Sequence, residues 1–199
     1  MRIGVFGGTF DPPHMGHLIL ADEARFQLEI DLLLWVLTPA PPHKLNLPIS
    51  PVAQRLKLVK TTINNNPNFT LSTIELDRPG PHYVIDTIRL LREKYIDDEI
   101  FYLMGGDSLR NLPNWNEPID FIWTVDGLGV MRRPGDLINL DELEEKIPGI
   151  SARVTFIDAP LLEISSSQIR ERISTGRPFQ FYLLPDVYQL ILKKKYYLD

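Results

Sequence analysis

Residues 3–17 decide the fold and have the sequence IGVFGGTFDPPHMGH. The first four form a short apolar run, which is typical of a strand buried on both faces. Gly7 and Gly8 end this run, and residues 15–28 then have the spacing of a helix. Paired glycines let a ligand approach the backbone, and the start of a helix offers N–H groups without partners. The order strand, glycine turn and helix therefore predicts a phosphate-binding loop.

The same alternation of strands and helices continues along the chain. We expect further strands at 32–37, 69–76, 100–104, 127–131 and 153–157, and helices at 51–63, 84–95, 166–175 and 185–195. Apolar strands that alternate with helices predict an α/β fold, a Rossmann-like, doubly wound parallel sheet with helices on both faces. We expect a single domain over 1–199, in which 160–199 form a small helical C-terminal part. Ligands of such sheets bind beyond the carboxyl ends of the strands.

Composition excludes several classes of protein. Of the 199 residues, 44% are apolar and 24% are charged, which is typical of a globular chain rather than a disordered one. The formal net charge of −5 argues against bulk nucleic acid as a partner, because a polyanion favours a basic surface. The absence of cysteine excludes a disulfide framework and thiolate chemistry. With no signal-peptide pattern and no long apolar run, we expect a cytoplasmic protein without a membrane partner.

Two histidines, His14 and His17, form the centre of the first candidate site. They lie three residues apart at the start of a helix, so their side chains project to the same side. Imidazoles donate hydrogen bonds to phosphate oxygens and balance the charge that develops in phosphoryl or nucleotidyl transfer. A structural pair, one capping and one packed, is the plain alternative. A zinc site is a third interpretation, for which a third ligand is not evident. The segment is neither a Walker A loop nor a GxGxxG fingerprint.

The second candidate site is residues 164–170, with the sequence ISSSQIR. Ser165 and Gln168 fit a capping box, which predicts the start of a helix, and Gly176 fits its end. The plain interpretation is a well-capped surface helix. The functional interpretation is that the free N–H groups, the serine hydroxyls and Arg170, one turn into the helix, together clamp a polyphosphate. A similar cap is expected at the helix over 51–63, with Ser50 as N-cap and Pro51 as its first residue.

Both segments resemble motifs of one known family. His14-Met15-Gly16-His17 is similar to the His-x-Gly-His signature of the nucleotidyltransferase superfamily, and residues 164–170 resemble its Ile-Ser-x-(Ser/Thr)-x-Ile-Arg motif. The preceding Gly-Gly-Thr-Phe-Asp-Pro, at 7–12, resembles the form in bacterial nicotinate mononucleotide adenylyltransferases. The two signatures stand about 150 residues apart in the expected order. The resemblance covers the chain from residue 2 to about residue 190.

The resemblance implies a reaction. The adenylyl group of ATP would pass to nicotinate mononucleotide and give nicotinate adenine dinucleotide and pyrophosphate, a step of NAD biosynthesis. The attacking phosphate is already an anion, so neither a general base nor a covalent intermediate is needed, and catalysis depends on positioning and charge stabilisation. We expect His17 at the α-phosphate and His14 at the neighbouring phosphates. Mg²⁺ is expected to enter with ATP, held by phosphates and water rather than by a protein metal site.

The remaining candidate residues follow the other strands. The expected ATP-binding residues are Gly8, Thr9, Phe10, Gly105, Asp107, Ile164, Ser165, Ser166, Ser167 and Arg170. The expected mononucleotide-binding residues are Thr9, Lys44, Tyr83, Val84, Trp115 and Asn116. Lys44 is either a solvated lysine or, on its proline-rich loop, a phosphate ligand. Asp107 either caps a helix or accepts hydrogen bonds from a ribose. Trp115 is either core or, as in the family's Leu-x-x-Trp, a ring stacked on the pyridine.

Two segments depart from the family pattern or stay ambiguous. Residues 81–87 resemble Pro-Ser-Tyr-Thr-x-Asp-Thr, with His82 and Val84 in place of Ser and Thr. In the family, backbone N–H groups at this Thr and near the Trp bind the nicotinate carboxylate. A backbone donor survives the change to valine, whereas a hydroxyl contact does not, so the preference for nicotinate over nicotinamide stays open. Arg132 and Arg133 begin a turn that lies either near the nucleotide or in solvent.

Other function classes fit some of the same residues. Within the superfamily, the alternative is that the acceptor is another phosphorylated molecule, such as nicotinamide mononucleotide or phosphopantetheine. A metal-dependent hydrolase with Asp11, His14 and His17 as ligands is a rival enzyme class. A nucleotide-binding module without turnover is a third. In the main interpretation, the partners are the small molecules ATP and nicotinate mononucleotide, with a homo-oligomer as a further possibility.

Overall fold

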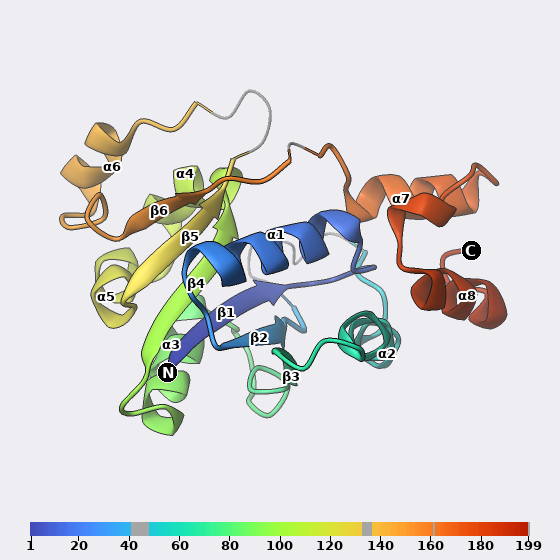
Figure 1. The fold of residues 1–199 in the computed structure, drawn as a ribbon, viewed down its shortest axis with the longest axis horizontal. Coiled ribbons are helices and arrows are strands. Elements are labelled where there is room, and N and C mark those ends of the chain that lie inside the picture. Colours follow the sequence, from blue (N-terminus) through green and yellow to red (C-terminus); the bar gives the residue numbers. More distant parts are fainter. Residues whose placement is uncertain (41–47, 133–136, 161, 199) are drawn as a thin grey trace.

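A parallel sheet forms the centre of the molecule. The computed structural model describes residues 1–40, 48–132, 137–160 and 162–198, and within them six strands form one sheet in the order β3-β2-β1-β4-β5-β6. The strands are β1 (Arg2–Gly8), β2 (Leu32–Leu37), β3 (Phe69–Ser72), β4 (Glu99–Gly105), β5 (Gly127–Met131) and β6 (Val154–Ile157), and each neighbouring pair is parallel (Figure 1). The chain builds outward from β1 in both directions, which confirms the predicted doubly wound sheet.

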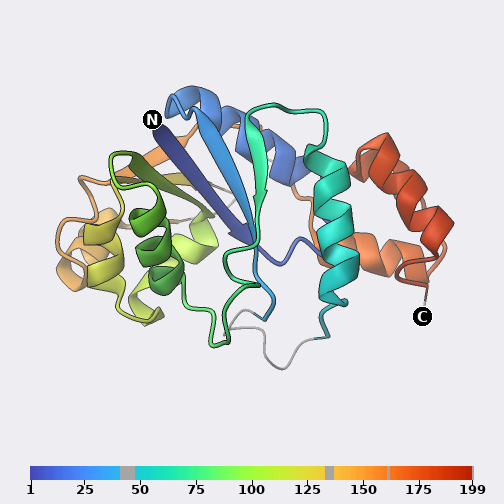
Figure 2. The same cartoon turned by 90° about the horizontal axis from the view of Figure 1, so that it is seen from below.

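Helices cover both faces of this sheet. They are α1 (Met15–Gln27), α2 (Val52–Ile63), α3 (Val84–Lys94), α4 (Gly106–Asn111), α5 (Pro118–Thr124), α6 (Leu140–Lys146), α7 (Ser166–Ser174) and α8 (Pro185–Lys194), with short 3-10 turns η2 (Leu112–Asn114) and η3 (Gln180–Tyr182). One core cluster joins the sheet to α1 and α2, and a second joins it to α3, α4, α5 and α6. Figure 2 shows α1 above the sheet and α3 below it. No helix of the described residues is both long and apolar enough to span a membrane.

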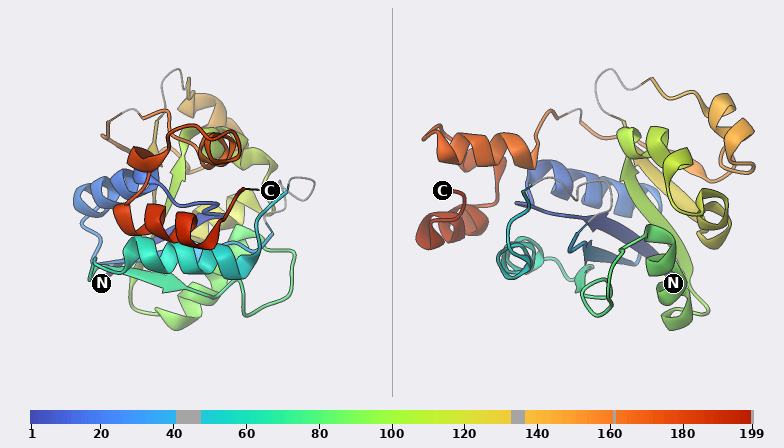
Figure 3. Two further views of the ribbon diagram at one scale, coloured as in Figure 1. Left: turned by 90° about the vertical axis from the view of Figure 1, so that its right-hand side faces the viewer. Right: turned by 180° about the vertical axis from the view of Figure 1, so that it is seen from behind.

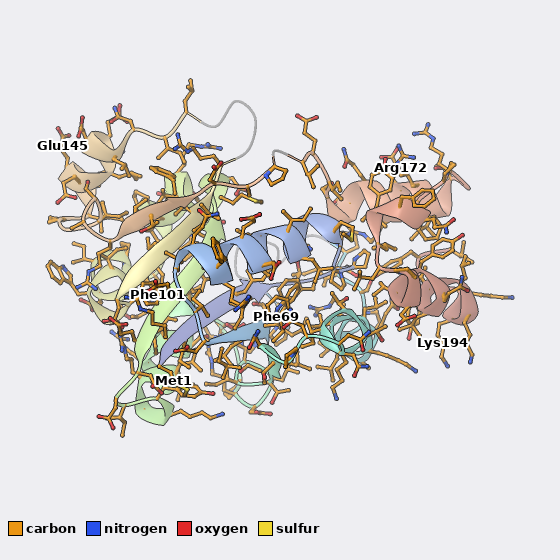
Figure 4. All side chains as sticks on the ribbon, in the orientation of Figure 1. Met1, Phe69, Phe101, Glu145, Arg172 and Lys194 are labelled. Atoms are coloured by element: carbon orange, nitrogen blue, oxygen red, sulfur yellow. The ribbon has the colours of Figure 1, made fainter. Side chains whose placement is uncertain are left out.

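The apolar runs are continuous because both faces of the strands are buried. Along β2, Leu34 and Val36 pack on the α3 side, whereas Leu33, Trp35 and Leu37 pack on the α1 side. Successive side chains of a strand point to opposite faces, so a strand covered on both sides needs an apolar residue at every position. Phe69 of the edge strand β3 and Phe101 of the inner strand β4, both labelled in Figure 4, pack into the same core cluster on the α1 side.

The last two helices form a third apolar cluster away from the sheet. Ile169 and Ile173 of α7 and Val187 and Ile191 of α8 pack together with Leu58 of α2. Figure 3 shows α8 lying beside α2 at one end of the molecule. The helical C-terminal part predicted at 160–199 therefore rests on a helix. This arrangement matters for the site, because α7 carries the second signature.

Some local predictions were wrong. Helix α2 begins at Val52 with Pro51 as its N-cap, so Ser50 does not cap it. The backbone N–H of Ser50 instead donates to Asp11 Oδ2, and the backbone carbonyl of Ser50 accepts from Arg55 Nε. Strand β3 ends at Ser72 rather than at 76, because the chain turns there. Gly105, not Asp107, is the N-cap of α4.

Candidate active site

A cavity of about 680 Å³ lies at the carboxyl end of the sheet. It is bordered by the loop after β1, the start of α1, the loop between β3 and α3, the α4–η2 turn and the start of α7. The strand order reverses between β1 and β4, so the connections leave toward opposite faces and open a crevice between them. The cavity therefore lies where the topology of the sheet predicts a ligand site.

Most of the predicted site residues meet at this cavity. Its lining includes His14, His17, Gly8, Thr9, Phe10, Asp107, Ser165, Ser166, Ser167, Arg170, Tyr83, Val84, Trp115 and Asn116. Gly105 and Ile164 adjoin it without lining it: Gly105 is the N-cap of α4, and Ile164 packs against the third cluster. Lys44 lies outside the described residues, and so does Arg133. Arg132 lies over the ring of Phe156 at 4.2 Å, away from this cavity.

The two histidines make structural contacts at the start of α1, and both also line the cavity. His14 is buried as the N-cap of α1, and its ring stacks on that of His17 with 3.7 Å between centroids. The backbone N–H of His14 donates to Nδ1 of His17 at 3.1 Å. An accepting Nδ1 carries no proton, so the neutral His17 ring has its proton on Nε2. That N–H is the donor which a phosphate oxygen in the cavity needs.

Phe10 holds the loop after β1 in a bent path. Its φ of +47° lies in the left-handed region, which is uncommon for a residue other than glycine. The ring is 2% exposed and meets His17 edge-on with 5.2 Å between centroids, and it also packs on Trp35. A Cβ at Gly8 would lie 3.0 Å from this ring, so glycine is needed for the ring to fold back. Backbone strain at such a position is typical of functional sites.

Arg55 is a site-forming residue that the sequence analysis missed. It is only 1% exposed, and its guanidinium donates to four backbone carbonyls, those of Ser50, Thr9, Thr38 and Pro39, at 2.8–3.0 Å. Burial lowers the pKa of this guanidinium, but an arginine stays a cation in proteins. Arg55 thus ties the loops after β1 and β2 to the start of α2, and it brings a positive charge behind the phosphate-binding loop.

The capping box predicted at the start of α7 is confirmed. Gln168 N–H donates to Ser165 Oγ, and Ser165 N–H donates to Gln168 Oε1, each at 3.2 Å. Helix α7 ends at Ser174 with Thr175 as its C-cap, and Gly176, which was predicted to mark the helix end, follows with a φ of +69°. The N–H of Gly176 bonds to Ile173 and that of Arg177 to Arg172, as in a Schellman motif. Both ends of α7 are therefore fixed by local sequence.

Contacts join α7 directly to the loop after β1. Ser166 Oγ donates to the carbonyl of Pro12 at 2.8 Å, and Arg170 Nη1 donates to the carbonyl of Asp11 at 2.7 Å. Arg170 Nη2 also lies 3.4 Å from Ser167 Oγ, so the side chain reaches back to the N-terminus of its helix. The two signatures of the sequence are thus one structural unit. Their N–H groups, hydroxyls and cation face the same cavity.

The opposite end of the cavity is formed by α3 and the α4–η2 turn. Tyr83 is the N-cap of α3 without a side-chain hydrogen bond, and Tyr83 and Val84 line the cavity. Arg78 supports this helix start by donating to the carbonyls of Pro81 and Tyr83. The first N–H groups of α3 can therefore receive an anion.

Trp115 packs against the core and also lines the cavity. It is half-buried and packs against the core on the α3 side, with centroids 5.6 Å from Phe121 and 6.2 Å from Tyr102. The same side chain lines the cavity, next to Asn114 and Asn116. Because its position is fixed by core packing, its ring is a rigid wall on which a flat ligand can stack.

Three buried titratable groups also line this end, of which the sequence analysis named only His82. Burial raises the pKa of the Glu75 carboxyl and of the Tyr102 hydroxyl. Burial, with the charge of Arg78, lowers the pKa of the His82 imidazole. All three shifts favour the neutral form. Glu75 Oε1 accepts a hydrogen bond from Thr87 Oγ1 at 2.7 Å.

The rival hydrolase interpretation needs Asp11, His14 and His17 as ligands of one metal ion. No group of three or more His, Asp or Glu side chains that could hold a metal occurs among the described residues. Asp11, the carboxylate of the rival hydrolase interpretation, already accepts hydrogen bonds from Ser50 N–H and Tyr197 Oη. The hydrolase interpretation therefore loses its carboxylate ligand to structural contacts. Asp107 is exposed at the rim, on a different wall.

The geometry and the family comparison agree. Residues 5–172 match the cytidylyltransferase-like family model, and the chain belongs to this family. The probable nicotinate-nucleotide adenylyltransferase of Thermomicrobium roseum is 41% identical over 90% of this chain and 84% of its own length. The nicotinate-nucleotide adenylyltransferase of Bacillus subtilis is 37% identical over 93% and 92%, respectively. The resemblance stated from the two signatures is thus confirmed over most of the chain.

Solved structures agree on the fold. Plasmodium falciparum nicotinic acid mononucleotide adenylyltransferase, in complexes with APC and with NaAD, matches with a TM-score of 0.80 at 19% identity. The match to the APC complex covers 98% of this chain and 96% of that chain. A nicotinate-nucleotide adenylyltransferase described as putative, from Vibrio parahaemolyticus, has a TM-score of 0.69 at 18% identity. At this level of identity the likeness concerns the fold.

Proposed function

We propose that this protein transfers the adenylyl group of ATP to nicotinate mononucleotide, which gives nicotinate adenine dinucleotide and pyrophosphate. The observation that carries the proposal is the junction of the two signature segments, in which Arg170 bonds to Asp11 and Ser166 to Pro12 at one cavity. The names of the curated relatives support the same reaction.

The phosphate end of the cavity supplies charge stabilisation. A phosphate oxygen of the acceptor attacks the α-phosphorus of ATP in line, and the bond to the pyrophosphate oxygen breaks. In the proposal, the Nε2–H of His17 meets the α-phosphate and His14 the neighbouring phosphates. The N–H groups at the start of α7, the serine hydroxyls and Arg170 hold the β- and γ-phosphates. Negative charge grows on the leaving pyrophosphate, where these donors are already in place.

The other end of the cavity orients the acceptor. Thr9 and Lys44 would hold its phosphate, and the N–H groups at Tyr83 and Val84 would receive the carboxylate of the pyridine. Trp115 would stack on the ring. Mg²⁺ bound to the ATP phosphates would neutralise part of their charge.

The remaining predicted residues surround the adenosine half of the substrate. Gly8 and Phe10 line the cavity, Gly105 is the N-cap of α4, and Ile164 precedes the N-cap of α7. Asp107, which is exposed at the rim, would accept hydrogen bonds from ribose hydroxyls.

A direct assay tests the reaction. The purified chain is incubated with ATP, Mg²⁺ and nicotinate mononucleotide, and pyrophosphate and dinucleotide are measured. Nicotinamide mononucleotide and phosphopantetheine serve as competing acceptors. We expect turnover with the pyridine nucleotides and a higher kcat/KM for nicotinate mononucleotide. A folded chain that releases no pyrophosphate with any acceptor, or that prefers phosphopantetheine, would contradict the proposal.

Replacement of His17 tests the catalytic step. His17→Ala removes a preorganised donor, so kcat should fall by about 10²–10³, as for the loss of an oxyanion donor. Thermal unfolding of the variant, compared with wild type, shows whether the fold is kept. A folded variant with near-normal kcat would remove His17 from the mechanism.

A further inference from the structure

Tyr197, which follows α8, reaches back to the loop after β1. Its hydroxyl donates a hydrogen bond of 2.9 Å to Asp11 Oδ1, although 186 positions separate the two residues. Asp11 is only 4% exposed, and its second carboxylate oxygen accepts the N–H of Ser50 at 3.0 Å. A buried carboxylate needs a donor at each oxygen, and the Tyr197 hydroxyl supplies one of them.

Asp11 lies in the part of the loop that shapes the phosphate end of the cavity. It stands between Thr9 and His14, and its backbone carbonyl accepts Arg170 Nη1. Arg170 Nη1 is also 3.9 Å from Asp11 Oδ2. A contact that holds the Asp11 side chain in place therefore also holds the backbone that leads into His14. It holds the Arg170 guanidinium as well, because that group bonds to Asp11.

The segment after α8 is bent so that the tyrosine can make this contact. Lys195 and Tyr197 have φ values of 53° and 66°, in the left-handed region that few non-glycine residues adopt. Such conformations persist only where the surroundings hold them. The Tyr197 ring packs against the third cluster, and the Gln54 side chain of α2 is a further hydrogen-bond neighbour of its hydroxyl. Burial raises the pKa of that hydroxyl, so it stays a donor.

We propose that Tyr197 is a positioning residue for the adenylyl transfer, acting through Asp11. The hydroxyl holds the carboxylate, the carboxylate holds the loop, and the loop presents His14 and the contact for Arg170. The C-terminal part is then a component of the active site rather than an appendage. This inference rests on the proposed function and adds to it a residue that touches neither substrate.

Kinetics of Tyr197→Phe test the inference. The variant keeps the ring and loses only the hydroxyl. Loss of one hydrogen bond to a charged group corresponds to about a tenfold or larger effect, which we expect in kcat. The KM for nicotinate mononucleotide should change much less, because Trp115 and the start of α3, which are proposed to bind it, lie at the other end of the cavity. Tyr196→Phe is the matched control, since its hydroxyl makes no hydrogen bond within the described residues and its ring meets that of Tyr197.

Two further measurements separate positioning from mere stability. Hydrogen exchange followed by mass spectrometry should be faster in peptides covering residues 9–14 of Tyr197→Phe, and unchanged in β4 and β5. In an Asp11→Asn background, adding Tyr197→Phe should lower kcat by a much smaller factor than it does in wild type, because the two residues act as one unit. Assays are run far below the unfolding temperature, so that every variant is folded.

The outcomes are separable. If wild type is active and Tyr197→Phe has normal kcat with unchanged exchange in residues 9–14, the inference is overturned. An equal loss of kcat in Tyr196→Phe would overturn it too. If wild type is inactive, the proposed function fails, and the exchange of residues 9–14 still decides whether Tyr197 holds the loop.

Discussion

Arg170 Nη1 donates a hydrogen bond of 2.7 Å to the backbone carbonyl of Asp11 across 159 residues of sequence. This contact makes one arginine serve two purposes. It ties the start of α7 to the loop after β1, and it leaves the rest of the guanidinium at the cavity, beside Ser167. The chemistry of the site therefore depends on how α7 is held against the sheet.

Replacing Arg170 should weaken ATP binding more than acceptor binding. Arg170→Lys keeps the charge and loses the planar fork that bonds to a carbonyl and a phosphate together. We expect the KM for ATP to rise about 10–100-fold, the equivalent of one charge-assisted hydrogen bond. Steady-state kinetics with each substrate varied in turn measures the effect. Arg172→Lys is the control, because Arg172 lies on the same helix (Figure 4) and donates instead to the carbonyl of Pro178. Equal changes in both variants would contradict the proposed clamp.

Arg55 should contribute to both stability and activity. Arg55→Met leaves four carbonyls without their donor in a buried place, so unfolding free energy should fall by at least about 3 kcal/mol. Urea denaturation measures it. Lys57→Met, on the exposed side of the same helix, should stay within about 0.5 kcal/mol of wild type. A loss of less than about 1 kcal/mol in the unfolding free energy of Arg55→Met would show that the loops after β1 and β2 keep their conformation without this arginine.

Trp115 should determine affinity for the acceptor. Trp115→Leu removes the aromatic wall, and base stacking on an aromatic ring is worth about 1–3 kcal/mol, so the KM for nicotinate mononucleotide should rise about tenfold. The KM for ATP should change little. Trp123→Leu, at a tryptophan that is 60% exposed on α5, controls for loss of an indole. If the ATP KM rises equally, Trp115 acts through the core instead.

Glu75 and Glu144 should affect the pH dependence of stability with opposite signs. Burial raises the pKa of Glu75 in the folded state, so the folded chain binds the proton more tightly and loses stability as pH rises above the unfolded value of about 4.3. Glu75→Gln removes this loss, so the free energy of unfolding of the variant should rise relative to that of wild type as pH rises. Backbone N–H groups of Gly149 and Ser151 lower the pKa of Glu144, so Glu144→Gln falls behind wild type as pH rises.

Urea unfolding from about pH 3 upward measures both variants, because the Glu144 effect develops below the unfolded value of about 4.3 and the Glu75 effect above it. The two difference curves against wild type should diverge with pH. Parallel curves would mean that Glu75 is ionised without cost in the folded chain.

The fold was predictable wherever long patterns decide it. Strands β2 and β5 begin and end at the predicted residues, because their apolar runs are unbroken. Helices α5 and α6 were missed, and α4 was anticipated only through Asp107 as its candidate cap, since six or seven residues are too few to show a helical period. The strand β3 was predicted too long, because alternation continues to Leu76 while the chain already turns at Thr73, whose carbonyl accepts the N–H of Leu76.

The site was predictable where it consists of contiguous motifs. The histidine pair and the α7 cap are local, and the cavity contains both. Arg55 was missed although it shares the buried stripe of α2 with Leu58 and Val59, a position at which a charge signals a structural role. Glu75 and Tyr102 could not be found in this way, because only the folded chain brings them to the cavity.

The third apolar cluster contains no strand residue among those described. The apolar side chains of α7, the helix that carries Arg170, thus pack against other helices rather than against the sheet. Substitutions at Ile173 or Ile191 can change the position of α7 without disturbing the packing of the strands. Nucleotide affinity and the stability of the sheet are therefore free to be adjusted independently as the sequence diverges.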